Sequence, residues 1–258
     1  MATIICIANQ KGGVGKTTTA VNLAASLAAA EKRTLLVDID PQGNAGSGVG
    51  VDKSSLTESI YDVLINDVTP ASVIVKTELP ALHILPSTPD LAGAELELVA
   101  TPGRERKLRD ALATVDASYD FMLIDCPPSL NLLTVNALVA ARSVLVPIQC
   151  EFYAMEGLSQ ILNTIRLVQK GLNPGLTIAG ILLTMFDARN NLSRQVSDEI
   201  RNHFPRETFK TVIPRNVRLS EAPSHGKPII LYDIASRGAT SYLDLARELM
   251  QRGRGANG

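Results

Sequence analysis

Residues 10–18 read Gln-Lys-Gly-Gly-Val-Gly-Lys-Thr-Thr, between an apolar run at residues 3–8 and a long alanine-rich stretch. Successive backbone N–H groups of a glycine loop, followed by the free N–H groups and positive dipole end of a helix, form a concave anion site. Lys16 is placed to reach the β- and γ-phosphates of a nucleoside triphosphate, and Thr17 to offer its hydroxyl to Mg²⁺. The predicted phosphate-binding residues are Lys11, Gly12, Gly13, Val14, Gly15, Lys16, Thr17 and Thr18.

This loop departs from the common phosphate-loop pattern, Gly-x-x-x-x-Gly-Lys-[Ser/Thr]. Gln10 stands where the first glycine belongs, and a second lysine, Lys11, follows it. The alternative interpretation is a glycine-rich turn that only joins a strand to a helix. The expected strand and helix flank the loop so closely that nucleotide binding is favoured.

The lysine-first loop resembles that of the deviant Walker A ATPases, and three further segments resemble the ParA/Soj branch of chromosome-partitioning proteins. They are Val-Asp-Ile-Asp-Pro-Gln-Gly-Asn at 37–44, Leu-Ile-Asp-Cys-Pro-Pro-Ser at 123–129, and the stretch from Val212 to Pro228. The likeness runs from Ile4 to about Met250. Four such motifs in order are highly specific.

Short β-branched runs alternate along the chain with longer segments rich in alanine and leucine. The short runs are apolar on both faces, which is typical of the interior of a parallel sheet covered by helices. We therefore expect an α/β, doubly wound, mainly parallel sheet with helices on both faces, the P-loop NTPase fold, with ligands bound beyond the carboxyl ends of the strands. The expected strands are 4–8, 34–38, 82–85, 121–125, 144–148 and 178–183; the expected helices are 16–30, 90–99, 104–115, 131–141, 156–169, 192–203 and 239–252.

Length and composition fit one large core. The chain has 258 residues, 45% of them hydrophobic, so we expect a single ATPase domain over 1–252 and a flexible tail over 253–258. It contains neither an 18-residue apolar run nor a signal-peptide pattern, so we expect a cytoplasmic, nucleoid-associated protein with no membrane partner. The three cysteines lie in or beside apolar runs without Cys-x-x-Cys spacing, which favours buried small hydrophobic residues over metal or redox roles.

Three aspartates end two of the expected strands. Asp125 closes an apolar strand in the Walker B arrangement, where a carboxylate holds Mg²⁺ directly or through water. Asp38 and Asp40 follow another buried strand, and their spacing of two puts both side chains on the same side if the strand continues. The resemblance implies that Asp40 positions and activates the attacking water and that Asp38 supports the Mg²⁺ shell. The alternatives are ordinary turn residues, with Asp40 capping the turn at 41–44.

Lys11 needs a separate role because Lys16 already serves the nucleotide of its own chain. The resemblance implies a homodimer with two ATP molecules between the subunits, in which Lys11 contacts the partner's phosphates and stabilises developing charge as an arginine finger does. Gly12 is expected at the closest approach of the two loops, where a side chain would clash. The alternative for Lys11 is a solvated loop charge.

The base is expected to be adenine. A common GTPase reads guanine with Asn-Lys-x-Asp after a late strand, whereas this chain has Thr184-Met185-Phe186-Asp187. By resemblance, the contacts to adenine come from the loop around Pro214 and Asn216, largely through backbone groups.

The net charge of −1 is unevenly distributed. Residues 1–185 carry 13 basic and 18 acidic side chains, a net charge of −5, and residues 186–258 carry 12 and 8, a net charge of +4. Such a C-terminal basic excess suits sequence-independent, salt-sensitive contact with double-stranded DNA, although a solvated surface is the alternative. By resemblance, Arg189 and Arg218 contact DNA, within a basic set that also includes Arg194, Arg201, Arg206, Lys210, Arg215, Lys227 and Arg237.

The expected function is therefore that of a DNA-segregation ATPase. By resemblance it dimerises on ATP and Mg²⁺, binds DNA nonspecifically, and releases it when a ParB-like, DNA-bound activator stimulates slow hydrolysis. One rival is a membrane-positioning ATPase like MinD, which needs a C-terminal amphipathic anchor that is not evident here. Another is an ATP-dependent ligase or amidotransferase, for which we find neither a substrate-specific insertion nor a cysteine nucleophile with a partnered histidine.

Overall fold

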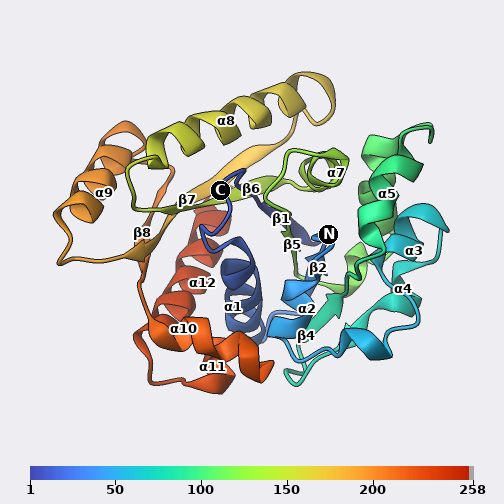
Figure 1. The fold of residues 1–258 in the computed structure, drawn as a ribbon, viewed down its shortest axis with the longest axis horizontal. Coiled ribbons are helices and arrows are strands. Elements are labelled where there is room, and N and C mark those ends of the chain that lie inside the picture. The colour runs from blue at the N-terminus through green and yellow to red at the C-terminus, as the bar shows by residue number, and fades with distance from the viewer. Residues whose placement is uncertain (256–258) are drawn as a thin grey trace.

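An eight-stranded sheet runs through the centre of the molecule in the order β3-β4-β2-β5-β1-β6-β7-β8 (Figure 1). The computed structural model describes residues 1–255. All neighbouring strands are parallel except β3 and β4, so the α/β, mainly parallel fold predicted from the sequence is confirmed. The strands are β1 (Thr3–Ile7), β2 (Thr34–Asp38), β3 (Val75–Lys76), β4 (Leu82–Leu85), β5 (Phe121–Asp125), β6 (Ser143–Gln149), β7 (Thr177–Phe186) and β8 (Thr208–Pro214).

The central strands are buried on both faces because their side chains alternate between two cores. In β5, Met122 and Ile124 belong to one core and Leu123 to the other. In β2, Leu35 and Val37 share the first core, and Leu36 faces the second. This period of two explains why the strands read as continuous apolar runs in the sequence.

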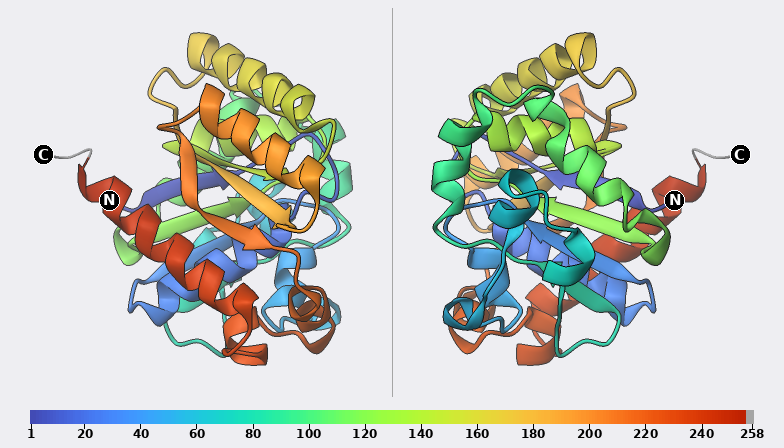
Figure 2. Two further views of the ribbon diagram at one scale, coloured as in Figure 1. Left: turned by 90° about the vertical axis from the view of Figure 1, so that its left-hand side faces the viewer. Right: turned by 90° about the vertical axis from the view of Figure 1, so that its right-hand side faces the viewer.

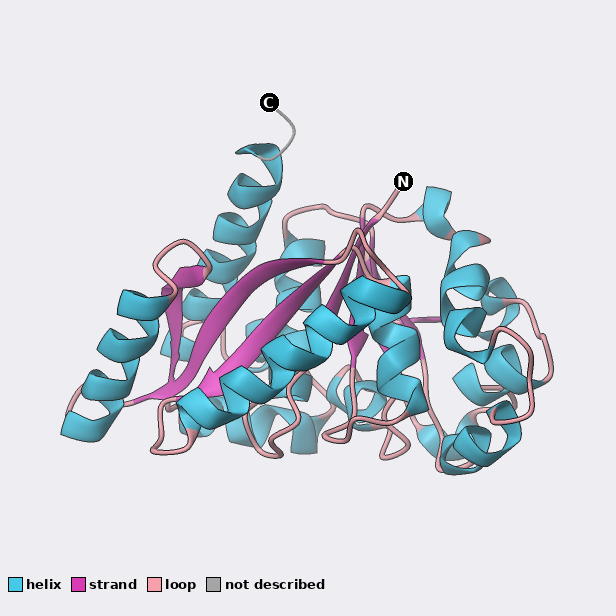
Figure 3. Ribbon diagram, turned by 90° about the horizontal axis from the view of Figure 1, so that it is seen from above, coloured by secondary structure: helices cyan, strands magenta, loops and turns pink. Residues whose placement is uncertain are grey.

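Helices cover both faces of the twisted sheet (Figures 2 and 3). The first core is closed by α3 (Ile60–Ile65), α4 (Pro70–Val73), α5 (Leu91–Leu98), α6 (Lys107–Ala113), α7 (Leu132–Ala140), α8 (Ala154–Gly171) and α9 (Asn191–His203). The second core is closed by α1 (Lys16–Ala29), α2 (Asn44–Gly48), α10 (Val217–Glu221), α11 (Ile229–Tyr232) and α12 (Arg237–Gly255). In Figure 3, α8 lies across one face of the sheet; in Figure 2, α12 lies on the other.

The first and last long helices pack together on the second core. Three alanines of α1, Ala20, Ala24 and Ala25, are fully buried and allow α12 to approach closely. The large side chain of Tyr242 fills the space between the helices, and its hydroxyl lies 3.3 Å from the Thr19 hydroxyl. The end of the chain thus completes the surroundings of the phosphate-loop helix.

The six expected strands are present with ends shifted by at most three residues. Two edge strands, β3 and β8, were not predicted, and neither were the short helices α2, α3, α4, α10 and α11. The expected helix at 104–115 begins as a 3₁₀ turn at Arg104–Arg106 before α6. Helix α12 includes residues 253–255 of the expected tail, and residues 256–258 lie outside the described part of the chain.

Candidate nucleotide site

The glycine loop connects β1 to α1 at the carboxyl edge of the sheet. Gly13 and Gly15 have φ angles of +74° and +83°, which side-chain-bearing residues rarely adopt. Gly12 is different, because its φ is not positive and a Cβ placed there would meet nothing within 4 Å. The fold of a single chain therefore requires glycine at 13 and 15 but not at 12.

The side chains of Asn9, Gln10 and Thr184 hold the loop in shape. The Asn9 amide donates to the carbonyl of Pro147 (2.8 Å), and its Oδ1 accepts the Lys11 N–H (2.9 Å). The Gln10 amide donates to the Thr164 hydroxyl (2.8 Å), and the buried Thr184 hydroxyl donates to the carbonyl of Val14 (2.9 Å). The sequence prediction missed these anchors; the only local signal was an asparagine directly after a strand, where turns begin.

Lys16 is buried at the start of α1, with only 7% of the residue exposed. Its Nζ donates to the carbonyl of Lys11 (3.1 Å), so the ammonium group lies against the loop. Burial lowers the pKa of Lys16, while the carboxylates of Asp125 and Asp40 raise it. A lysine held between the loop and two carboxylates suits the binding of phosphate oxygens and a cation together.

Asp125 ends β5 beside the first turn of α1. Both of its carboxylate oxygens are buried and accept no hydrogen bond of ordinary geometry from residues 1–255. Burial raises the pKa of Asp125 well above its usual value, the charge of Asp38 raises it further, and the neighbouring Thr17 hydroxyl opposes the rise. Unpartnered buried oxygens beside a threonine hydroxyl fit the expected Mg²⁺ site.

No cluster of three His, Cys, Asp or Glu side chains able to hold a metal occurs within residues 1–255. This fits a magnesium site completed by substrate phosphates and water, because Mg²⁺ usually keeps several waters and takes one or two carboxylates. Thr17 and Asp125 are the residues that would hold it.

Asp38 is fully buried and accepts three backbone hydrogen bonds. Oδ1 accepts the Asp40 N–H (3.1 Å), and Oδ2 accepts the N–H groups of Ala45 (3.0 Å) and Gly46 (3.2 Å) at the start of α2. Burial raises its pKa to about 7 against the lowering effect of these bonds. Asp38 thus fixes the segment that carries Asp40, which suits a supporting role at the metal site.

Asp40 lies just beyond β2 and is 9% exposed. Its Oδ1 accepts the N–H of Gln42 (2.9 Å), so it does cap the turn that follows. No hydrogen bond to Oδ2 is formed within residues 1–255, which leaves this oxygen available for water. One oxygen of the carboxylate can therefore cap the turn while the other binds water.

A cavity of about 340 Å³ opens beside Gly15 and Thr18. Pro214 and Asn216, the residues predicted to surround the base, both line it. The Asn216 Oδ1 accepts the N–H of Leu219 (3.3 Å) and caps α10, so that oxygen serves the helix. The remaining lining residues, not predicted from the sequence, are Thr184, Met185, Ile213, Arg215, Leu219, Ser220, Pro223 and Tyr242.

Lys11 lies at the outer side of the loop and is partly exposed. Its Nζ is 3.5 Å from Oε2 of Glu151, in the segment between β6 and α8. Next to Glu151, the side chains of Phe152 and Tyr153 are largely exposed and contact each other edge to face. The carboxyl edge of the sheet therefore presents a cation and an apolar pair to the outside.

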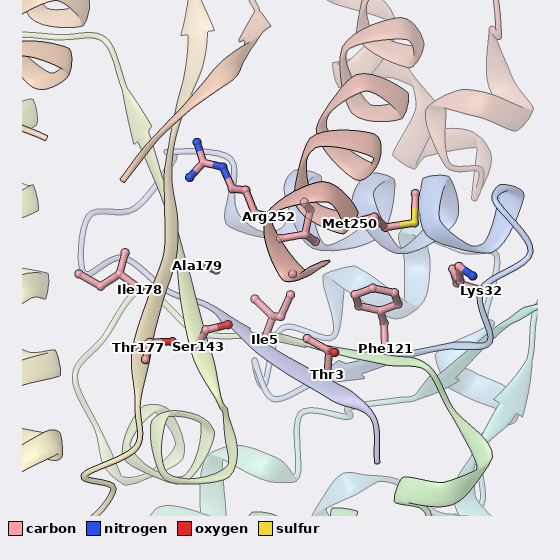
Figure 4. Close-up of a pocket in the computed structure, with 12 residues that line it drawn as sticks. Thr3, Ile5, Lys32, Phe121, Ser143, Thr177, Ile178, Ala179, Met250 and Arg252 are labelled. Carbon is pink, nitrogen blue, oxygen red and sulfur yellow. The ribbon is translucent and has the colours of Figure 1, made fainter. Parts of the chain in front are cut away.

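A second hollow, of about 430 Å³, lies at the opposite, amino edge of the sheet (Figure 4). Its walls include Ile5, Phe121, Ala179 and Met250. The guanidinium of Arg252 at its rim already donates to backbone carbonyls of Glu207 and Thr208. The hollow brings together no phosphate loop and no paired carboxylates, so nucleotide chemistry belongs to the carboxyl edge.

Arg189 and Arg218, the two residues predicted to contact DNA, follow the ends of neighbouring strands. Phe186 of β7 pairs with Pro214 of β8, and Arg189 and Arg218 come three and four residues later. Both are exposed, and Arg215 lies between them in the chain. Arg206 precedes β8 and so lies at the amino ends of the strands, opposite Arg189 and Arg218. The nine basic residues therefore do not form one face.

The comparisons with known proteins identify the family of the chain. A family model described as "AAA domain" matches residues 2–178. The chain is 63% identical to "Chromosome partitioning protein ParA" of Myxococcus xanthus (strain DK1622), covering 96% of this chain and 88% of the relative. It is 60% identical to "Sporulation initiation inhibitor protein Soj" of Bacillus subtilis (strain 168), covering 98% and 100%.

Among solved structures, the fold is similar to cobyrinic acid a,c-diamide synthase from Mycobacterium smegmatis with bound ADP and magnesium. The TM-score is 0.86 at 39% identity, covering 98% of this chain and 96% of the other. The chain has the glycine loop, the buried lysine and the Walker B carboxylate. It is also 60–63% identical to ParA and Soj over nearly its full length. The chain therefore belongs to the ParA/Soj family of P-loop chromosome-partitioning ATPases.

Proposed function

We propose that this protein is a DNA-segregation ATPase that dimerises on ATP, binds double-stranded DNA nonspecifically as a dimer, and releases it after hydrolysis. The loop N–H groups and Lys16 hold the phosphates of the substrate, and Thr17 and Asp125 hold the metal. Mg²⁺, when bound, neutralises charge on the phosphate oxygens. Asp40 orients the attacking water through Oδ2 while Oδ1 keeps the turn in place.

The observation that carries the proposal is the pair Lys11 and Gly12. Within one chain, residue 12 has neither a conformational nor a steric need for glycine. The Lys11 ammonium lies 3.5 Å from the exposed Glu151 and pairs with no other carboxylate within residues 1–255. Both features are accounted for if a second copy approaches the loop and the two Lys11 side chains reach across to each other's nucleotide.

DNA contact is assigned to Arg189 and Arg218, which lie at the same edge of the sheet as the nucleotide. Their contact is with phosphates, which makes binding independent of base sequence and sensitive to salt. Dimerisation doubles this surface and so links DNA affinity to ATP. We place the protein in the cytoplasm on the nucleoid, with a ParB-like, DNA-bound protein as the activator of hydrolysis.

The two rival functions find less support. Within residues 1–255, no helix has the length and apolarity needed to cross a bilayer. The apolar side of α12 is packed into the core through Tyr242, Leu245 and Leu249, and so is not available as an amphipathic anchor. Although one structural neighbour is named a diamide synthase, Cys6, Cys126 and Cys150 are all buried and none hydrogen-bonds a histidine in the described chain.

DNA retention and sedimentation, measured together with ADP, ATP and a nonhydrolysable ATP analogue over a salt series, test this function. We expect a dimer and DNA retention only with the triphosphates, and weaker retention as salt rises. Equal retention with ADP, or a monomer that binds DNA just as tightly with ATP, would remove the proposed switch. Retention on lipid vesicles but not on DNA would favour the membrane-positioning rival.

A further inference from the structure

The guanidinium of Arg218 is held by two acidic side chains. Its Nη1 lies 2.9 Å from Oε2 of Glu221, one turn later on α10, and its Nε lies 3.4 Å from Oδ2 of Asp233, just after α11. The Arg218 side chain is still 55% exposed. One cation therefore faces two anions and solvent, and the local net charge of the three groups is −1.

A neighbouring aromatic pair keeps Glu221 in place. The Tyr232 hydroxyl donates to the same Oε2 of Glu221 (3.1 Å), and the Tyr232 ring stacks on His225 with centroids 4.9 Å apart. The bond to Arg218 lowers the pKa of Glu221, and the Tyr232 bond lowers it further. Glu221 is thus an ionised, oriented partner of Arg218.

Arg189, the other predicted DNA contact, is not neutralised in this way. Its backbone N–H donates to Oδ1 of Asp187 (2.9 Å), but its guanidinium forms no ion pair within residues 1–255. The two arginines would therefore bind a phosphate differently. Arg189 has no competing carboxylate within residues 1–255, whereas Arg218 must first loosen its contacts with Glu221 and Asp233.

We propose that Glu221 and Asp233 compete with DNA phosphates for Arg218 and thereby limit the affinity of this surface for double-stranded DNA. This inference rests on the proposed function, in which Arg218 contacts DNA. The carboxylates act in two ways: they occupy the guanidinium donors, and their own charges repel the phosphate backbone. Neither residue is part of the nucleotide site.

Removing one of these charges should strengthen DNA binding. Exposed ion pairs of this kind alter an equilibrium by about twofold to fivefold, so we expect a gain of that size in each subunit of the dimer. Because Arg218 then engages phosphate more completely, the dependence of log Kd on log salt should steepen, by at most about 0.9 per subunit.

The test measures binding of a fluorescent duplex by anisotropy, with a nonhydrolysable ATP analogue and several salt concentrations, for Glu221→Gln and Asp233→Asn. The matched control is Asp244→Asn, which removes the same charge from another exposed pair one turn apart, Asp244 with Arg247 on α12 (2.6 Å). Thermal unfolding confirms that each variant is folded. We expect tighter binding and a steeper salt slope in the first two variants and a smaller change in the control.

Glu221→Gln in an Arg218→Ala background completes the design. Since the competition for guanidinium donors acts through Arg218, the gain from Glu221→Gln should fall in this background to that of the Asp244→Asn control, which reports charge repulsion alone. An equal gain in the Asp244→Asn control would assign the effect to net charge, and weaker binding in Glu221→Gln would make Glu221 a positioning residue for Arg218; either result overturns the inference. If the unaltered protein with the ATP analogue fails to bind DNA, it is the proposed function that fails.

Discussion

Asp38 and Asp125 are paired in register at the carboxyl ends of β2 and β5, and both are fully buried. Burial raises the pKa of Asp38 from 3.8 to about 7 and raises that of Asp125 as well. The charge of Lys16 opposes the rise at Asp125, and the pKa of Lys16 is itself lowered by burial. The pair thus concentrates negative charge where the substrate's metal is expected, at a cost to the nucleotide-free fold.

The stability of the nucleotide-free protein should fall as the pH rises through this range. Between about pH 4 and pH 7 Asp38 is protonated more in the folded chain than in the unfolded chain. The stability that Asp38 contributes is therefore complete below about pH 4 and is lost as the pH rises through about 7. Asp125→Asn removes one buried charge, so it should raise the melting temperature at pH 8 and flatten the dependence between pH 5 and pH 8. Calorimetry without nucleotide checks this, with Asp244→Asn as the control; identical slopes in Asp125→Asn and the unaltered chain would contradict it.

Asp40→Asn should keep the cap of the turn at Gln42 but lose the charge that is proposed to orient the attacking water. The amide oxygen can still accept the Gln42 N–H, but the charge that orients water is gone. We expect hydrolysis to slow by about 10²–10⁴-fold while ATP binding and dimerisation persist. Single-turnover hydrolysis and sedimentation with ATP measure the two properties. Asp40→Ala, which also removes the cap, should add a loss of stability of about 1 kcal/mol; normal hydrolysis in either variant would exclude Asp40 from this role.

Gly12→Val and Gly13→Val should fail in different ways. Residue 12 has room for a side chain within its own chain, so Gly12→Val should bind nucleotide normally and remain a monomer. Residue 13 has a φ of +74°, so Gly13→Val strains the loop by about 1–3 kcal/mol and should weaken nucleotide binding itself. Titration of a fluorescent ATP analogue, combined with sedimentation, distinguishes them. Dimerisation of Gly12→Val at saturating ATP would show that no second copy lies against residue 12.

Glu151→Gln should favour the dimer at limiting ATP. In the free chain Glu151 holds Lys11 at 3.5 Å, and dimerisation requires Lys11 to leave it. Because the pair is partly exposed, its loss should change the dimerisation constant by at most about fivefold per subunit. Sedimentation over an ATP series measures the shift, with Glu156→Gln, on the exposed side of α8, as the control. Weaker dimerisation in Glu151→Gln would mean that Glu151 serves the dimer directly.

The sheet could be predicted because its central strands are apolar on both faces and bounded by turn residues. The edge strand β8 escaped prediction because its sequence, Thr-Phe-Lys-Thr-Val-Ile-Pro, is neither a continuous apolar run nor a regular alternation, with Phe209 buried and Lys210 exposed. The short helices escaped because four to six residues show no helical period. Their position depends on distant contacts, such as Asp38 with the start of α2.

The residues of the candidate site also differ in how well they could be predicted from the sequence. The loop residues and the strand-end aspartates stand in local sequence patterns, so they could be proposed as site residues from the sequence. Asn9, Thr184 and Glu151 act through partners 138, 170 and 140 residues away, and no local pattern reports such a contact. The grouping of Arg189 with Arg218 also depends on the pairing of β7 with β8.

The packing of α12 on α1 has a consequence for biosynthesis. Tyr242 lies against Thr19 and also lines the cavity beside Gly15 and Thr18, so this cavity lacks a wall until α12 has emerged from the ribosome. Until then the nascent polypeptide leaves the apolar side of α1 uncovered, a surface that chaperones bind. A ligand of this cavity can therefore gain its full set of contacts only after α12 has been synthesised and has packed on α1.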